Sequence, residues 1–506
     1  MKKNKKKNRN IGPVSTIIGM IVFIAILSFI LNKLGVEGYI TVISNGTMEA
    51  HLETVNNVLS IAGFKYFVGN IITNFKNFEP LFSIIIILIG ISICEKSGLF
   101  RDIFSRMKKF KYGFIVFITL FLGIISSIIG DYSFIVLIPL VGIMYKYLEK
   151  NPIVGLLVAY VGLTLGYGIG IFANYNDYSL GILTQSAANV DVDPNYVFSI
   201  SSTFIINLVS TLLICIIGYF IISKFLLNKF TKKYVVEEEQ ETSNKALTSS
   251  LIAFLILNLL LIYFIIDVKL PGAGILLDKS QNVYIAKLFS DAAPFKQGII
   301  VIISLILMLC GAIYGKISKN IKNSNEYSLS LSKSFENLGL LFVLMFFMSQ
   351  FISILEWSNI GTVLCAKLLQ FMSSFTFSGV FLIVIFFLVV VLSSIFIPGT
   401  LSKWLIMSPT IVPLFMRANI SPAFTQFIFQ AADSVGKIIS PSFIYFIILI
   451  AYLEKYRRDD KKQVTIFGTL KLLLPTILIM TVVWIIIVCL WYVAGFPIGA
   501  GFNSVL

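Results

Sequence analysis

The chain has 506 residues, of which 57% are hydrophobic and only 13% are charged, and its mean hydropathy is +0.91. This composition excludes a soluble globular protein and predicts an all-α polytopic membrane protein, because each membrane-spanning helix uses about 20 mostly apolar residues. The net charge of +15 does not indicate nucleic acid as a partner, since the excess Lys and Arg lie in short segments between apolar runs, where basic residues set membrane orientation. We therefore expect the lipid bilayer to be the main surrounding of this chain.

The N-terminal segment, residues 1–10, is strongly basic and is expected in the cytoplasm. An apolar run without an obvious cleavage site follows, so residues 11–79 are predicted to hold a retained first transmembrane helix and an outside loop. Residues 101–111 are again rich in Lys and Arg and are expected in the cytoplasm, whereas residues 174–200 contain aspartates and no basic residue and are expected outside. An odd number of crossings then places the C-terminus outside.

Up to about thirteen apolar runs could cross the membrane, several of them short or broken by Gly, Pro or charge. The candidate runs are 12–32, 80–95, 112–130, 132–147, 153–173, 202–227, 247–266, 297–315, 338–355, 376–397, 402–416, 423–453 and 466–494. A cytoplasmic linker is predicted at 228–246, near the middle of the chain, and connecting helices at 247–335. The last transmembrane helix and the outside C-terminus are predicted within 463–506.

Two segments resemble each other and predict an internal repeat. Pro139 and Pro152 frame an apolar stretch with the same spacing as Pro409 and Pro422, and each stretch ends near a basic residue. By the charge pattern, the segment 80–227 and the segment 336–462 cross the membrane in opposite directions. Inverted repeats with interrupted helices are typical of secondary transporters, which bind substrate and coupling ion where the helices break.

Four polar sites lie in or beside these repeats, and an ionisable residue in an apolar segment indicates function by default. Asp131 is either the N-cap of the following helix or an ion-coupling residue. Asp177 follows a glycine-rich stretch and is either a loop residue or an ion-coupling residue. Asp433 has Ser434, Gly436, Ser440 and Pro441 around it, which predict a helix that unwinds in the membrane. Its alternative is a buried ion pair with Lys437 at i+4.

The fourth site is Lys403-Trp404, which follows the sequence Ile-Pro-Gly-Thr-Leu-Ser. Trp404 is either an interfacial anchor or an aromatic platform beside a cation, which would suit an aromatic carboxylate. Neither a phosphate-binding loop nor a metal-ligand cluster is present in the sequence, and the cysteines lie within apolar runs without CxxC spacing. We therefore expect no cofactor, no metal and no enzymatic activity, and transport coupled to a proton or sodium gradient.

At these residues the chain resembles the aminobenzoyl-glutamate transporter (AbgT) family, from about residue 80 to residue 460. The resemblance rests on the sequences EKSGLF, GDYSFIVLIPL, Gly166–Asp177, EWSNIG, LSKWLIMSPTIVPL and ADSVGKIISP. The family's aspartate after the Gly-Phe-Ser-Ala-Asn stretch falls on Asp177, so that Asn174 belongs to this region. Its Ala-Lys-Trp falls on residues 402–404, its Ser-Pro proline on Pro422, and its Gly-Asp-Ser aspartate on Asp433.

The resemblance implies a homodimer in the bacterial inner membrane, with about nine transmembrane helices plus two re-entrant hairpins in each subunit. It also implies transport of p-aminobenzoyl-glutamate or efflux of antifolate drugs. Two departures concern the ligand: the family's arginine is Gln430 here, and an expected asparagine is Ser394. Because arginine pairs bidentately with carboxylates, Lys403 or Lys437 is expected to supply the replacement charge.

The leading hypothesis is an ion-gradient-coupled carrier of a small organic anion that works by alternating access. The expected substrate-binding residues are Asn174, Ser394, Lys403, Trp404, Pro422 and Gln430, and the expected ion-coupling residues are Asp131, Asp177 and Asp433. A dicarboxylate or other organic-anion carrier of related architecture is the alternative within transport. A channel, or an intramembrane enzyme using Asp131 and Asp177, is the alternative from another class.

Overall fold

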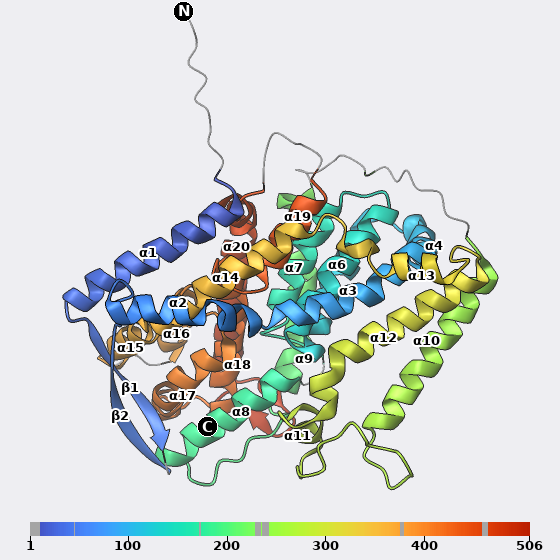
Figure 1. The fold of residues 1–506 in the computed structure, drawn as a ribbon. Coiled ribbons are helices and arrows are strands. Elements are labelled where there is room, and N and C mark those ends of the chain that lie inside the picture. The colour runs from blue at the N-terminus through green and yellow to red at the C-terminus, as the bar shows by residue number, and fades with distance from the viewer. Residues whose placement is uncertain are drawn as a thin grey trace, which may run out of the picture.

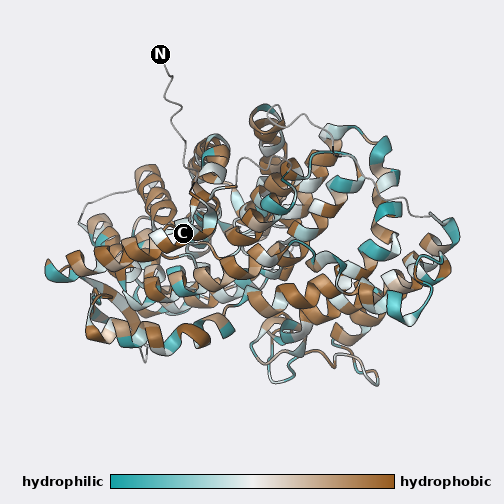
Figure 2. Cartoon of the chain, turned by 45° about the horizontal axis from the view of Figure 1, so that its top comes forward, coloured by the Kyte–Doolittle hydropathy of each residue, from teal (hydrophilic) through white to brown (hydrophobic). Residues whose placement is uncertain are grey.

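The computed structural model describes residues 11–44, 46–171, 174–227, 234, 242–374, 379–457 and 464–506. Within these ranges, eight helices are long and apolar enough to cross a membrane, and four further apolar helices are shorter. Apolar residues cover most helices, while polar residues gather at helix ends and loops (Figure 2). The predicted helical polytopic membrane protein is thus confirmed. The basic segment 1–10 and most of the linker 228–246 lie outside the described residues.

The first part of the chain contains more structure than the loop expected at 33–79. Helix α1 (Pro13–Lys33) is followed by the antiparallel strands β1 (Glu37–Ser44) and β2 (Thr47–Thr54) and by helix α2 (Ile61–Lys76). The two strands pair along their whole length, from Glu37 with Thr54 to Ser44 with Thr47. Ser60 begins α2 by accepting a hydrogen bond from the backbone N–H of Gly63.

A first series of helices follows α2. These helices are α3 (Pro80–Ser97), α4 (Leu99–Arg106), α5 (Tyr112–Ile125), α6 (Tyr132–Tyr147), α7 (Pro152–Leu165), α8 (Tyr175–Asp191) and α9 (Phe204–Phe225), with short 3-10 turns at Met107–Lys109 and Ser126–Ile129. Helices α5 and α6 form a helical hairpin that packs against α7. A side chain at Gly123 of α5 would place its Cβ 2.8 Å from the Cα of Gly162 in α7, so these glycines permit the close contact.

The middle of the chain forms one edge of the molecule. Helices α10 (Asn244–Ile265) and α12 (Pro294–Ile317) pack side by side there, α12 also packs on α3, and the short α11 (Tyr284–Phe289) lies between them in sequence (Figure 1). Many large apolar side chains of α10 are exposed, and few of its residues are buried. This exposure fits contact with lipid, because a helix that faced water with so many apolar side chains would be unfavourable.

A second series begins after α13 (Ser324–Ser330) and a 3-10 turn at Lys333–Phe335. Its helices are α14 (Gly339–Trp357), α15 (Ile360–Ser373), α16 (Gly379–Ser393), α17 (Thr400–Arg417), α18 (Pro422–Ile439), α19 (Phe446–Lys455) and α20 (Ile466–Ala494). The strands β3 (Pro497–Gly499) and β4 (Phe502–Asn503) end the chain. The core runs through α7 and α18, whose side chains are almost all buried.

The order of elements is the same in the two series: a long helix, a short helix, a pair of helices, an interrupted helix and a final long helix. Gly98 between α3 and α4 and Asn359 between α14 and α15 both have positive φ, of 89° and 58°. Pro139 lies inside α6 as Pro409 lies inside α17, and Pro152 and Pro422 begin α7 and α18. The prolines that suggested the repeat therefore occupy matching positions.

Two boundaries differ from the sequence-based expectation. Residues 174–200 were expected to form an outside loop, but Tyr175–Asp191 forms α8, which packs against α17 and α18. Its polar residues lower its hydropathy, and among them Thr184 and Asp177 form hydrogen bonds with α17 or α18. The run 423–453 is interrupted at residues 440–445, which include Ser440 and Pro441 of the predicted break, while Asp433 itself lies within α18. Ser440 and Pro441 cause this break, because proline cannot continue the hydrogen-bonded helix.

Candidate functional site

The connections within the hairpins α5–α6 and α16–α17 and the breaks in α7–α8 and α18–α19 meet in the interior of the protein. Small residues allow these segments to approach each other closely. The segment between α16 and α17 lies against α18, where a Cβ at Gly436 would be 2.4 Å from Ser394 Oγ. The break between α7 and α8 also approaches α18, where a Cβ at Gly168 would be 2.9 Å from the Cα of Ala431. Larger side chains at these glycines would separate the elements. The sequence thus builds a tight junction from residues distant along the chain.

A charge centre formed by Lys403, Asp433 and Lys437 occupies this junction. Lys403 of α17 donates to Asp433 Oδ1, and Lys437 Nζ lies 3.2 Å from Asp433 Oδ2. All three side chains are at least 98% buried. Each charge is expensive to bury alone, and here each has an opposite charge in contact. The predicted alternative for Asp433, an ion pair with Lys437, is therefore present, and a second lysine joins it.

Neighbouring hydroxyl groups complete the charge centre. Thr400 Oγ1 donates to Asp433 Oδ2 at 2.7 Å, and Ser394 Oγ lies 3.2 Å from Oδ1. Lys403 Nζ also lies 2.6 Å from Ser394 Oγ, and Lys437 donates to Thr400. Because Ser394 and Thr400 flank the turn between α16 and α17, these bonds tie that turn to α18.

The ammonium group of Lys437 also has aromatic neighbours. Its Nζ lies 3.1 Å from the ring centroid of Tyr167 and 5.5 Å from that of Phe443. The hydroxyl group of Tyr167 donates to Asp131 Oδ1. Cation–π contacts of this kind favour the charged form of a desolvated lysine. The break after α7 and the start of α6 are thereby connected to the charge centre.

A second polar cluster lies beside the charge centre, where α8 contacts α17 and α18. Asn174 and Asp177 form a capping box at the start of α8, and Gln430 Nε2 donates to Asp177 Oδ1 at 2.8 Å. Asp177 is thus in the first turn of a helix and not in a loop. This cluster puts the predicted residues Asn174, Asp177 and Gln430 in direct contact.

Trp404 connects to the same cluster. Its Nε1–H donates to Thr184 Oγ1 at 3.0 Å, and Thr184 Oγ1 donates to Gln426 Oε1 at 2.9 Å. The indole is fully buried and lies 4.5 Å, centroid to centroid, from the ring of Phe429. An interfacial anchor would be half exposed, so the interior aromatic position is the one the structure shows.

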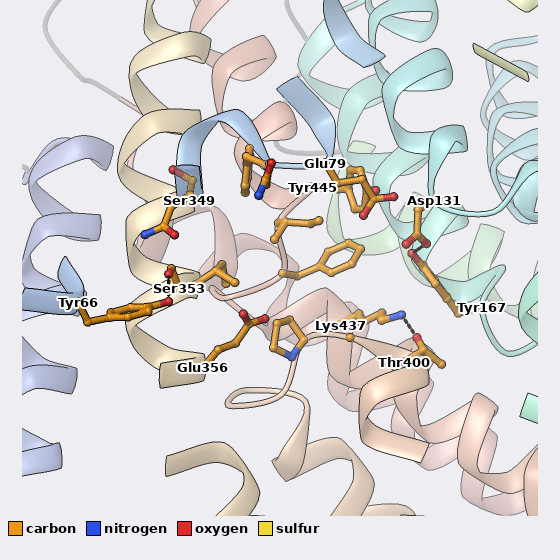
Figure 3. A pocket seen from close by; sticks show the side chains of 18 residues that line it. Tyr66, Glu79, Asp131, Tyr167, Ser349, Ser353, Glu356, Thr400, Lys437 and Tyr445 are labelled. Carbon is orange, nitrogen blue, oxygen red and sulfur yellow. Dashed lines mark hydrogen bonds between the residues drawn. The ribbon is translucent and has the colours of Figure 1, made fainter. Parts of the chain in front are cut away.

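A cavity of about 400 Å³ borders the charge centre (Figure 3). The labelled side chains of Glu79, Asp131, Glu356 and Lys437 point into this space from four different parts of the chain. The remaining lining includes polar and aromatic side chains, among them Tyr66, Asn74, Asn77, Tyr167, Ser349, Ser353, Thr400, Phe443 and Tyr445. A polar cavity with a buried cation and aromatic walls has the character of a small-molecule site.

A second cavity of about 190 Å³ shares Glu79 and Asp131 with the first. It also reaches Tyr132, Asn176 and Lys296. The predicted N-cap role of Asp131 is not what the structure shows: it precedes α6, but its side chain makes no capping hydrogen bond and accepts from Tyr167 instead. Asp131 therefore stands between two cavities and beside the charge centre.

The structure brings most predicted residues together but leaves one apart. Ser394, Lys403 and Asp433 belong to the charge centre, whereas Pro422 begins α18 and is separated from Asp433 by three turns of helix. Of the nine predicted substrate-binding and ion-coupling residues, Asp131 alone lines the larger cavity, and Lys437, the predicted replacement charge, lines it as well. The functional candidates that sequence reasoning missed are Glu79, Tyr167, Thr184, Glu356, Thr400 and Gln426. Two features of the sequence could have indicated such residues: Glu79 precedes Pro80 at the start of a helix, and Glu356 lies near the end of another.

Within the described residues, no group of three or more His, Cys, Asp or Glu side chains could hold a metal ion. The side chains of the charge centre are instead mutually paired, and the cavity offers a lysine, hydroxyl groups, amides and carboxylates. Such an arrangement suits reversible binding of a charged organic molecule.

Comparisons with known proteins identify the family of this chain. The model of the AbgT putative transporter family matches residues 5–506. The p-aminobenzoyl-glutamate transport protein of Escherichia coli (strain K12) is 26% identical over 499 residues, which cover 97% of this chain and 93% of that protein.

Two solved structures are also similar. The YdaH transporter of Alcanivorax borkumensis is 24% identical with a TM-score of 0.49, covering 97% of this chain and all of that one. MtrF of Neisseria gonorrhoeae, from a class of antimetabolite efflux pumps, is 27% identical with a TM-score of 0.49 and 98% coverage of both chains.

These features define a polytopic membrane transporter with a polar interior site. Because the family model covers almost the whole chain, the protein belongs to the AbgT putative transporter family.

Proposed function

We propose that this protein is an ion-gradient-coupled secondary transporter of p-aminobenzoyl-glutamate or a related aromatic carboxylate. The observation that carries the proposal is the buried charge centre where the turn between α16 and α17 meets α18, beside a 400 Å³ cavity. The similarity to the Escherichia coli p-aminobenzoyl-glutamate transport protein, which extends over 97% of the chain, supports the substrate class. The coupling ion is a proton or sodium.

The arrangement of the two series of helices supports alternating access as the mechanism of the proposed carrier. We infer that they form inverted repeats, each with a re-entrant hairpin, α5–α6 and α16–α17, and an interrupted helix, α7–α8 and α18–α19. The charge pattern along the chain supports a cytoplasmic N-terminus, an outside C-terminus and about nine crossings. Movement of one hairpin relative to its interrupted helix would open the cavity to one side at a time.

Lys437 is the better of the two lysines to attract a substrate carboxylate. Lys403 is completely enclosed and does not line the cavity, whereas Lys437 does. Gln430, at the position of the family's arginine, is bonded to Asp177 and also lies away from the lining. Lys437 is two helical turns further along α18. The positive charge that lines the cavity is therefore that of Lys437, on the same helix as Gln430.

Exchange across proteoliposome membranes tests the proposal. Purified protein is reconstituted with unlabelled p-aminobenzoyl-glutamate inside and the labelled compound outside, with and without an imposed ion gradient. Saturable counterflow is expected of a carrier, whereas a channel would give flux that does not saturate. Folded protein without counterflow would contradict this substrate, and dicarboxylates and antifolates would then be compared in the same assay. The mass of the detergent-solubilised protein tests the expected homodimer.

A further inference from the structure

Each oxygen of the Asp433 carboxylate already has two polar partners. Oδ1 accepts from Lys403 Nζ and lies 3.2 Å from Ser394 Oγ, whereas Oδ2 accepts from Thr400 Oγ1 and forms an ion pair with Lys437 Nζ. A carboxylate offers about four lone-pair positions in total. A metal ion could bind Asp433 only by displacing one of these donors.

The charge of the centre opposes a further cation. Within the charge centre itself, two lysines and one aspartate sum to one net positive charge, and the three side chains are almost completely buried. Charges interact strongly in such surroundings, so adding a sodium ion would be unfavourable. The other charged groups facing Lys437 are Asp131, through Tyr167, and the carboxylates of Glu79 and Glu356 across the cavity.

Lys437 bridges Asp433 and the start of α17. It comes from α18, bonds to Asp433 one turn earlier on the same helix, and bonds to Thr400 at the start of α17. It therefore joins the turn before α17 to α18, as a cation bound between oxygen atoms of the two elements would do. Lys403 is enclosed away from the cavity, whereas Lys437 forms part of its wall.

From these contacts we propose that Lys437 is a tethered cation that replaces an exchangeable metal ion at Asp433, so that transport does not depend on sodium. The inference rests on the proposed function as an ion-coupled carrier and selects between its two coupling ions. It excludes sodium and leaves the proton as the coupling ion. Lys437 is thus the residue that determines ion specificity.

Sodium binding by purified protein tests the proposal without any substrate. The unfolding temperature is measured while NaCl replaces KCl or choline chloride at constant ionic strength. Wild-type protein should show no sodium-specific change, because a ligand stabilises only a state that binds it. Lys437→Asn removes the ammonium group and offers an amide oxygen, so it should gain a rise in unfolding temperature that saturates with sodium.

Two variants serve as controls. Lys437→Arg keeps a tethered positive charge and should not respond to sodium. The double variant Lys437→Asn, Asp433→Asn lacks the carboxylate and should lose the response gained by the single variant. These variants locate the new cation site at Asp433.

Two results would overturn the proposal: a saturable sodium-specific rise in the wild type, or its absence in folded Lys437→Asn. If that variant does not fold, Lys437→Gln replaces it, and the wild-type measurement decides the sodium question by itself. Failure of counterflow with p-aminobenzoyl-glutamate would count against the proposed function but would leave this binding result unchanged.

Discussion

Removing Asp433 should destabilise the protein more than removing Lys403, although the two side chains are bonded to each other. Asp433→Asn leaves two buried lysines without a negative partner, whereas Lys403→Met leaves the one-to-one pair of Lys437 and Asp433. Loss of one partner from a buried ion pair costs about 3–5 kcal/mol. We therefore expect a loss of that size for Asp433→Asn. Lys403→Met should cost less than about 2 kcal/mol, because the apolar replacement also removes a buried charge.

The measurement is the free energy of unfolding of the purified variants in mixed micelles, from titration with a denaturing detergent. The double variant Asp433→Asn, Lys403→Met is the control, and it should recover part of the loss because only one lysine then lacks a partner. If Asp433→Asn were as stable as Lys403→Met, the charge centre would not be held by the aspartate, and the reasoning would be refuted.

Three further predictions concern other parts of the structure. Thr184→Val leaves the indole N–H of Trp404 without its acceptor and should lower the unfolding free energy by about 1–3 kcal/mol, whereas Thr184→Ser should not. Gly436→Val should cost a similar amount, about 1–3 kcal/mol, since its side chain would collide with Ser394; Gly19→Val, where nothing lies within 4 Å, is the matched control. Hydrogen bonds from serines lower the pKa of Asp278, in the loop between α10 and α12, from 3.8 to about 2. These bonds therefore stabilise the loop above pH 3.8 and weaken as the pH falls towards 2. Pepsin should cut this loop more slowly in the wild type than in Asp278→Asn at pH 4, and the difference should disappear near pH 2; the same ratio of rates at both pH values would contradict this.

The sequence predicted the transmembrane character and most helices because lipid imposes a long apolar run on each crossing. It failed at α8, whose polar side chains face α17 and α18, and at the segment 33–79, where a β-hairpin and α2 had been expected to be a loop. Hydropathy reports contact with lipid and says little about polar segments that are covered by other helices.

The candidate site was predictable only in part. The i+4 spacing indicated the contact of Asp433 with Lys437, which the structure contains. The contact with Lys403 depends on how α17 packs against α18, and local sequence does not specify such packing. Glu79 and Glu356 lie at helix ends and became candidates only when the fold placed them around one cavity with Asp131.

The central claim, that this cavity is the binding site of an alternating-access carrier, is tested most directly by its accessibility. Ile352 lines the cavity, and Ile352→Cys in a background without the partly accessible Cys489 can be labelled with a membrane-impermeant maleimide from either side of oriented vesicles. We predict that p-aminobenzoyl-glutamate slows labelling and changes the side from which it occurs. Labelling from both sides at equal rates, unaffected by p-aminobenzoyl-glutamate, would contradict the account.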